Sequence, residues 1–138
     1  MAMDEAVRLI YRDLVRTGFR YSGKLDNPSI FLDTLEEGVR LCSSVTNGFM
    51  NIYLVVQDNV VKKARYLCSC DPTANVVVET MCILVEGKTL EQVENMQETD
   101  FYQAIGSRGE SLVKRVQGMI ELLHRGIKKY RSGNHPAA

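Results

Sequence analysis

The chain has 138 residues, enough for one domain with a core that needs no disulfide or metal to fold. Its 17 lysines and arginines balance its 17 aspartates and glutamates, which argues against a protein that binds nucleic acid over its whole surface. No segment is apolar for long enough to span a membrane, and the first residues lack the pattern of a signal peptide. We therefore expect a cytoplasmic protein that binds neither nucleic acid nor membranes, with a single domain over residues 1–138 and a frayed tail at 132–138.

The first predicted element is a helix over residues 4–16, because apolar side chains recur there every three to four residues and Gly18 follows. A loop rich in turn-forming residues follows at 21–28. The segment 30–45 is ambiguous, since part of it suits one face of a helix while residues 39–43 could equally alternate as a strand. The helical interpretation depends on Leu32, Leu35, Val39 and Cys42.

A hairpin is predicted next, with strands over residues 49–57 and 60–68. Asp58 and Asn59 lie between the strands, and both tolerate the positive φ that a two-residue turn requires. In the first strand the residues expected to alternate toward one side are Met50, Ile52, Leu54 and Val56. In the second strand the residues expected to form a solvated face are Lys62, Lys63 and Arg65.

A buried helix is predicted after the hairpin. Asp71 can accept hydrogen bonds from free amides of a first turn, and Pro72 suits the first helical position. Residues 73–85 are almost entirely apolar, and Gly87 supplies the stop. The branched side chains of residues 76–78 would favour a strand, but the caps and the length favour a helix.

The last third of the chain predicts two short helices and one long one. Thr89 and Gln92 have the spacing of a capping box, as do Ser107 and Glu110, while Thr99 precedes another short helix. The longest amphipathic stripe in the chain follows: Leu112, Val116, Met119, Ile120, Leu123, Ile127 and Tyr130. The sequence therefore predicts an α+β fold, with a small antiparallel sheet of about three strands packed against several helices.

The candidate chemistry lies in the cysteines. Residues two apart in an extended chain face the same side, so the thiols of Cys68 and Cys70 could point at one site, with Asp71 next to them. The following helix N-terminus favours the thiolate form, and two thiolates with a carboxylate make a partial site for iron or zinc. Cys42 could supply a third thiol. The alternative is that one cysteine packs inward as a small apolar residue and Asp71 only caps the helix.

The other reactive residues suggest no site. Cys82 lies inside the apolar helix and is expected in the core, His124 is expected at the surface, and His135 lies in the tail. The chain has no nucleophile motif and no glycine-rich phosphate loop. We therefore expect a protein that is not an enzyme.

The order of these elements resembles the NifU N-terminal, or IscU-like, iron–sulfur cluster scaffold family. Local matches are residues 64–66, which are similar to the family's Ala-Arg-Phe, and residues 85–90, which are similar to Val-Lys-Gly-Lys-Ser-Leu. Residues 26–28 and 99–100 resemble its Glu-Asn-Pro and Thr-Asp. The resemblance implies a NifU-like α+β fold, an iron or iron–sulfur cargo, and a cysteine desulfurase or a cluster acceptor as partner.

The chain departs from the family at its three cysteine ligands. The first ligand position matches residues 46–48, which contain no thiol, and the second matches Asp71, with Cys70 one residue early. The third belongs to a His-Cys pair whose nearest match is Lys114 and Arg115. The family's Leu-Pro-Pro-Val-Lys segment is absent too.

Two hypotheses follow. In the first, a divergent scaffold binds iron or a labile cluster through a shifted set of ligands, namely Cys68, Cys70, Asp71 and Cys42. In the second, the chain keeps the scaffold fold without a metal and acts as a binding or regulatory partner. A cluster usually needs four ligands, and the sequence supplies only a partial set.

Overall fold

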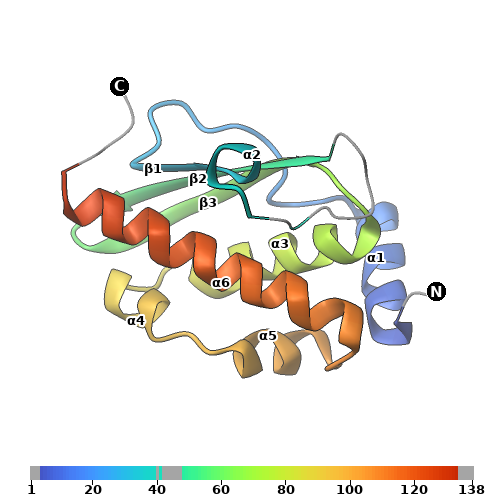
Figure 1. Ribbon diagram of the computed structural model, residues 1–138. Coiled ribbons are helices and arrows are strands. Elements are labelled where there is room, and N and C mark those ends of the chain that lie inside the picture. The colour runs from blue at the N-terminus through green and yellow to red at the C-terminus, as the bar shows by residue number, and fades with distance from the viewer. Residues whose placement is uncertain (1–3, 40, 42–47, 134–138) are drawn as a thin grey trace.

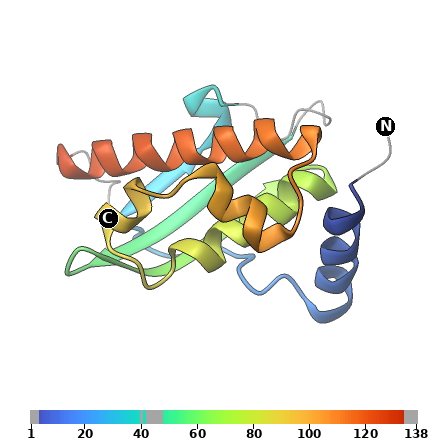
Figure 2. The ribbon, with the colours of Figure 1, turned by 90° about the horizontal axis from the view of Figure 1, so that it is seen from below.

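The computed structural model describes residues 4–39, 41 and 48–133. Within these ranges the sheet lies on one side of the molecule and the helices α3 and α6 cover one of its faces, while α1 lies at one end (Figure 1). Seen from below, α4 and α5 lie beside α6 (Figure 2). The elements are α1 (Glu5–Thr17), β1 (Ile30–Asp33), α2 (Thr34–Glu37), β2 (Phe49–Gln57), β3 (Val60–Ser69), α3 (Pro72–Val85), α4 (Leu90–Glu94), α5 (Glu98–Ile105) and α6 (Glu110–Arg131).

The sheet is antiparallel with the order β1-β2-β3, as the α+β prediction expects. Its third strand lies where the sequence was ambiguous. Ile30 and Leu32 point into the core while Phe31 is partly exposed, and Asp33 then caps the single turn of α2. Neither interpretation of 30–45 anticipated this strand, because four residues are too few to show a period. Residues 40 and 42–45 of that segment lie outside the described ranges.

The hairpin is confirmed. Asp58 and Asn59 have φ values of 53° and 64°, the left-handed conformation that their short polar side chains tolerate. The pairing shifts by one residue between Val55 and Val56. Such a bulge interrupts the alternation of inward- and outward-facing side chains along a strand. It explains why two consecutive residues of β3, Lys62 and Lys63, are both exposed.

The buried helix α3 is confirmed. Asp71 accepts a hydrogen bond from the amide of Ala74 at 2.8 Å, and Pro72 occupies the first turn. The residues 76–78 are helical and buried, so the cap and the surrounding core outweigh their strand preference.

The C-terminal helix α6 differs from the prediction at its start. Ser107 does not cap it; the hydroxyl donates instead to Asp4 at 2.6 Å, and Gly109 is the N-cap residue. Ser107 thus connects the turn before α6 to the cap of α1, a contact between distant residues that spacing alone does not reveal. The buried stripe also includes Leu122, which the prediction missed. None of the described helices is both long and apolar enough to cross a membrane.

The helix α6 crosses β1 at Gly126. A Cβ atom on this glycine would lie 2.9 Å from the Cγ2 atom of Ile30 and 3.1 Å from the Cδ1 atom of Leu32. At these distances the side chains of Ile30 and Leu32, or the elements that carry them, must shift, so the absence of a side chain at Gly126 allows the close approach of α6 to β1.

We predict that Gly126→Ala lowers the free energy of unfolding by about 1 kcal/mol, because overpacking of about 1–3 kcal/mol exceeds the gain in helix propensity of about 1 kcal/mol. Urea denaturation measures the change. Lys128→Ala, at an exposed position of the same helix, is the control and should change stability little. A higher free energy of unfolding for Gly126→Ala would contradict this prediction, because it would mean that the added methyl group is accommodated without a loss of stability.

Candidate functional site

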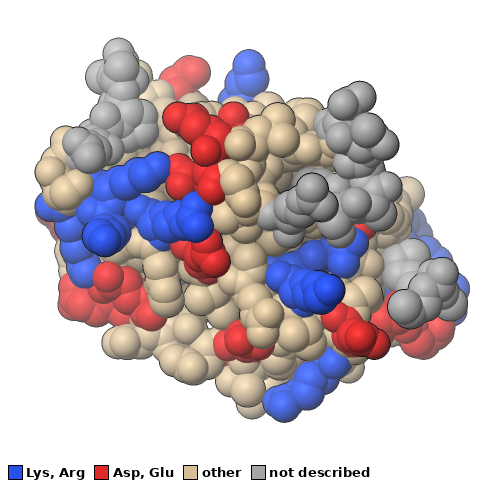
Figure 3. Space-filling view, in the orientation of Figure 1, with Lys and Arg blue, Asp and Glu red and all other residues tan. Residues whose placement is uncertain are grey.

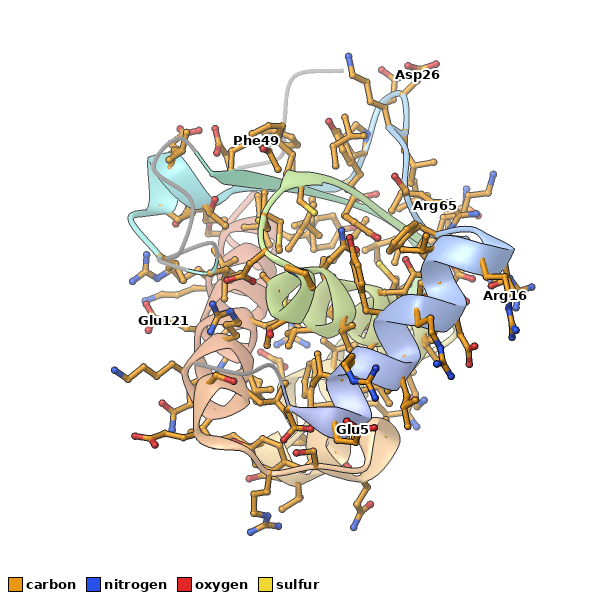
Figure 4. The ribbon with its side chains drawn as sticks, turned by 90° about the vertical axis from the view of Figure 1, so that its right-hand side faces the viewer. Glu5, Arg16, Asp26, Phe49, Arg65 and Glu121 are labelled. Carbon is orange, nitrogen blue, oxygen red and sulfur yellow. The ribbon has the colours of Figure 1, made fainter. Side chains whose placement is uncertain are left out.

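The predicted ligands lie where β3 ends and α3 begins. We call this region the β3–α3 corner, defined by Cys68, Cys70, Asp71, Asn75 and the Arg115 side chain that reaches it from α6. Phe49, at the start of β2, marks the same corner in Figure 4. At this corner the sheet, the buried helix α3 and the long helix α6 meet.

The carboxylate of Asp71 contacts both α3 and α6. One carboxylate oxygen accepts the cap hydrogen bond from Ala74, and the other forms an ion pair with Arg115. The two side chains of the pair are only 14% and 13% exposed, so solvent screens their attraction weakly. Arg115 also donates to the carbonyl oxygen of Ser111 at 2.7 Å, whereas its buried Nε atom has no partner among the described residues. Asp71 therefore holds the start of α3 against α6.

The two cysteines of the corner are half-buried. Asn75 lies 3.6 Å from the sulfur of Cys68, and burial, with a smaller contribution from Asp71, raises the pKa of this thiol to about 11. Cys70 is disulfide-bonded, and its sulfur lies 3.3 Å from the carbonyl oxygen of Phe49. Cys68 is a free thiol, so no disulfide joins it to Cys70. In this state neither sulfur is a thiolate.

Three of the four predicted ligands thus share the corner. Cys68, Cys70 and Asp71 lie within four residues of one another, while Cys42 lies outside the described residues. Among the residues that the structure describes, no group of three or more histidine, cysteine, aspartate or glutamate side chains is arranged to hold a metal ion. As described, the corner is a partial site, and metal binding there stays a prediction.

A buried polar network next to Cys68 was not anticipated. The hydroxyl of Tyr66 lies 2.8 Å from Oε1 of Glu79 and 2.9 Å from Oδ1 of Asn75. Glu79 is only 3% exposed, and its carboxylate also accepts from the backbone amides of Arg20 and Tyr21. Burial raises the pKa of Glu79. The sequence holds one sign of this network: Asn75 and Glu79 are polar residues one helical turn apart in an otherwise apolar helix.

The remaining candidates lie where the sequence suggested. Cys82 is fully buried, and burial raises its pKa well above the ordinary value. His124 is at the surface, with Nε2 3.0 Å from the carbonyl oxygen of Glu94. His135 lies outside the described residues.

Comparisons with known proteins identify the fold. No model of a known protein family and no curated protein matches the sequence. The structure is similar to that of a nitrogen-fixing NifU-like protein (N-terminal) from Brucella abortus, with a TM-score of 0.55 and 11% identity over 91% of this chain and 94% of that chain. It is also similar to a putative iron–sulfur cluster assembly scaffold protein for the SUF system from the thermophile Fervidobacterium islandicum AW-1, with a TM-score of 0.50 and 12% identity over 97% of this chain and 90% of that chain.

These similarities show the fold and confirm the NifU-like α+β architecture. The resemblance in sequence matched one ligand position of the scaffold family with Asp71 and another with the pair Lys114 and Arg115, of which Arg115 reaches the corner. Asp71 and Arg115 are 44 positions apart, and the structure brings them into direct contact. The two matched positions therefore meet in space, but they form an ion pair.

We predict a strong energetic coupling between Asp71 and Arg115. Asp71→Asn keeps a good helix cap but removes the charge, and Arg115→Gln removes the cation. Because the pair is shielded from solvent, we expect a coupling free energy of about 1–3 kcal/mol from the two single variants and the double variant in urea denaturation. A coupling below about 0.3 kcal/mol would mean that the pair does not hold α3 to α6.

The raised pKa of Glu79 predicts how the stability of the protein depends on pH. Its pKa is raised in the folded protein, so the folded state keeps this proton to a higher pH than the unfolded state. The contribution of Glu79 to stability should therefore fall as the pH rises from the ordinary glutamate value through the raised folded pKa. Urea midpoints of wild type and Glu79→Gln between about pH 4 and pH 8 isolate this contribution. Parallel curves for the two proteins would contradict the assignment.

Proposed function

We propose that the chain acts in iron–sulfur cluster assembly as a scaffold-type protein that binds iron or a labile cluster at the β3–α3 corner. The shared fold supports this role, because the two similar structures are a NifU-like protein and a putative scaffold protein for iron–sulfur cluster assembly. One observation carries the choice of the corner. Asp71, matched with one ligand position of the scaffold family, contacts Arg115, which belongs to the pair matched with another.

The proposed ligands are Cys68, Cys70 and Asp71 of the corner together with Cys42. Cysteine sulfur and carboxylate oxygen are both suitable ligands for iron. In the described state each ligand of the corner is engaged otherwise: Asp71 with Arg115, Cys68 as a protonated thiol and Cys70 in a disulfide. Binding therefore requires reduction of Cys70, loss of a proton from Cys68 and release of Asp71 from Arg115. These costs favour weak binding, which suits a cargo that is passed on.

The proposal includes no catalytic step. The protein would hold a cargo and exchange it with other proteins, and the resemblance suggests a cysteine desulfurase as the sulfur source or a cluster acceptor as the recipient. Zinc is a further candidate for the same thiol and carboxylate ligands.

A second candidate function is favoured by the ion pair itself. Arg115 already neutralises Asp71, so the corner is stable without a metal ion. In this alternative the chain keeps the scaffold fold and works as a metal-free binding or regulatory partner in the same process.

Anaerobic reconstitution with iron, sulfide and a thiol reductant separates the two candidates. We predict that wild type takes up iron, measured by metal analysis and absorbance, and that Cys68→Ser/Cys70→Ser loses this uptake. Arg115→Gln should bind iron roughly tenfold more tightly, because Asp71 no longer has a competing cation. Lys114→Gln, which removes an exposed positive charge one residue away, is the matched control and should behave as wild type.

Two outcomes would contradict the first candidate. If wild type takes up no iron under conditions that load an ordinary scaffold, the metal-free function stands instead. If the double cysteine variant binds as much iron as wild type, the corner is not the binding site.

A further inference from the structure

The outer face of α1 carries a basic groove that the proposed cargo site does not use. The groove has a volume of about 460 Å³ and is lined by residues of a single helix: Arg8, Tyr11, Arg12, Val15 and Arg16. Three arginines follow one another at intervals of four residues, and beside them runs a short apolar row of Tyr11 and Val15. Val15 is 60% exposed.

The arginines of this face are available to a partner. Among the residues that the structure describes, Arg8 pairs with Glu5 and Arg16 with Asp13, both of the same helix, at 2.6 Å and 3.0 Å, and all four side chains are about half exposed or more. Exposed ion pairs of this kind contribute little to the stability of the fold, so their arginines can exchange these partners for others. Arg12 forms no hydrogen bond or ion pair with any residue that the structure describes. In Figure 4 the helix faces the viewer, with Glu5 at one end and Arg16 at the other.

The basic residues near the end of α6 are different. Lysines and arginines gather there with acidic residues around them (Figure 3). Lys129 pairs with Glu37 of α2, and Arg131 pairs with Glu94 of α4. These cations connect elements of the fold, whereas within the described part of the chain the ion pairs of Arg8 and Arg16 stay inside α1.

We propose that the basic groove of α1 docks an acidic amphipathic helix of a partner protein. Residues four apart on a helix are about 6 Å apart along its axis, so carboxylates spaced four residues apart can face all three arginines at once. An apolar side chain of the partner would cover Val15 and Tyr11 at the same time. Charge complementarity selects the acidic partner, and the exposed Val15 beside the half-buried Tyr11 selects a folded helix with an apolar side.

Two other anionic partners fit less well. A membrane surface needs a broad apolar face to insert, but the broad apolar face of α1 packs on the core through Val7, which is fully buried. The evenly spaced phosphates of a nucleic acid need an extended basic surface, whereas this protein has 17 basic and 17 acidic residues and no net charge.

The test uses a fluorescent synthetic peptide as the probe, a helix with glutamates every four residues and leucines on the adjoining side. We expect binding by fluorescence anisotropy, weaker at higher salt, with amide shift changes by NMR concentrated in residues 5–17. Arg8→Gln/Arg12→Gln/Arg16→Gln should weaken binding roughly tenfold or more. Lys62→Gln/Lys63→Gln, which removes two exposed cations from β3, is the control and should bind as wild type. Circular dichroism confirms that both variants fold.

Three results would overturn the proposal. The first is no peptide binding up to millimolar concentration, and the second is equal binding by the triple arginine variant. The third is tighter arginine-dependent binding to phosphatidylglycerol vesicles or to duplex DNA than to the peptide, which would assign the groove to those partners. Iron uptake of the triple variant should equal that of wild type, so loss of docking and loss of cargo binding are distinguishable.

Discussion

The ion pair between Asp71 and Arg115 determines how the two principal helices meet the sheet. Asp71 starts α3 as its cap and binds α6 through Arg115, so one carboxylate orients both helices at the end of β3. Removing either partner would leave a largely buried charge, which is costly in a protein interior. The same carboxylate is one of the proposed ligands, so in the proposed function cargo binding would compete with structural support at this residue.

The buried network around Glu79 supports the corner from the other side. Through Tyr66 and the backbone amides of Arg20 and Tyr21, it joins β3, α3 and the loop after α1. Cys68 lies beside this network, next to Asn75, and the same apolar surroundings that bury Glu79 keep the thiol protonated. The chemistry of the cysteine therefore depends on how tightly the core is closed around it.

Much of the fold followed from local signals in the sequence. Asp58 and Asn59 specified the hairpin turn, and Asp71 with Pro72 specified a helix where the valines alone suggested a strand. The strand β1 was missed because it is too short to show a period, and the cap at Ser107 was wrong because its hydroxyl binds the distant Asp4. The corner was located by Cys68, Cys70 and Asp71, but the partnership with Arg115 is a contact across 44 residues that no local pattern reveals.

Iron K-edge X-ray absorption of the anaerobically loaded wild-type protein tests the proposed corner most directly, because it reports the atoms bound to iron. The shifted ligand set predicts a first shell that contains both sulfur and oxygen, and replacement of Cys70 by serine should lower the sulfur contribution. A first shell of oxygen and nitrogen alone would contradict cargo binding at the corner and would leave the ion pair as a purely structural feature.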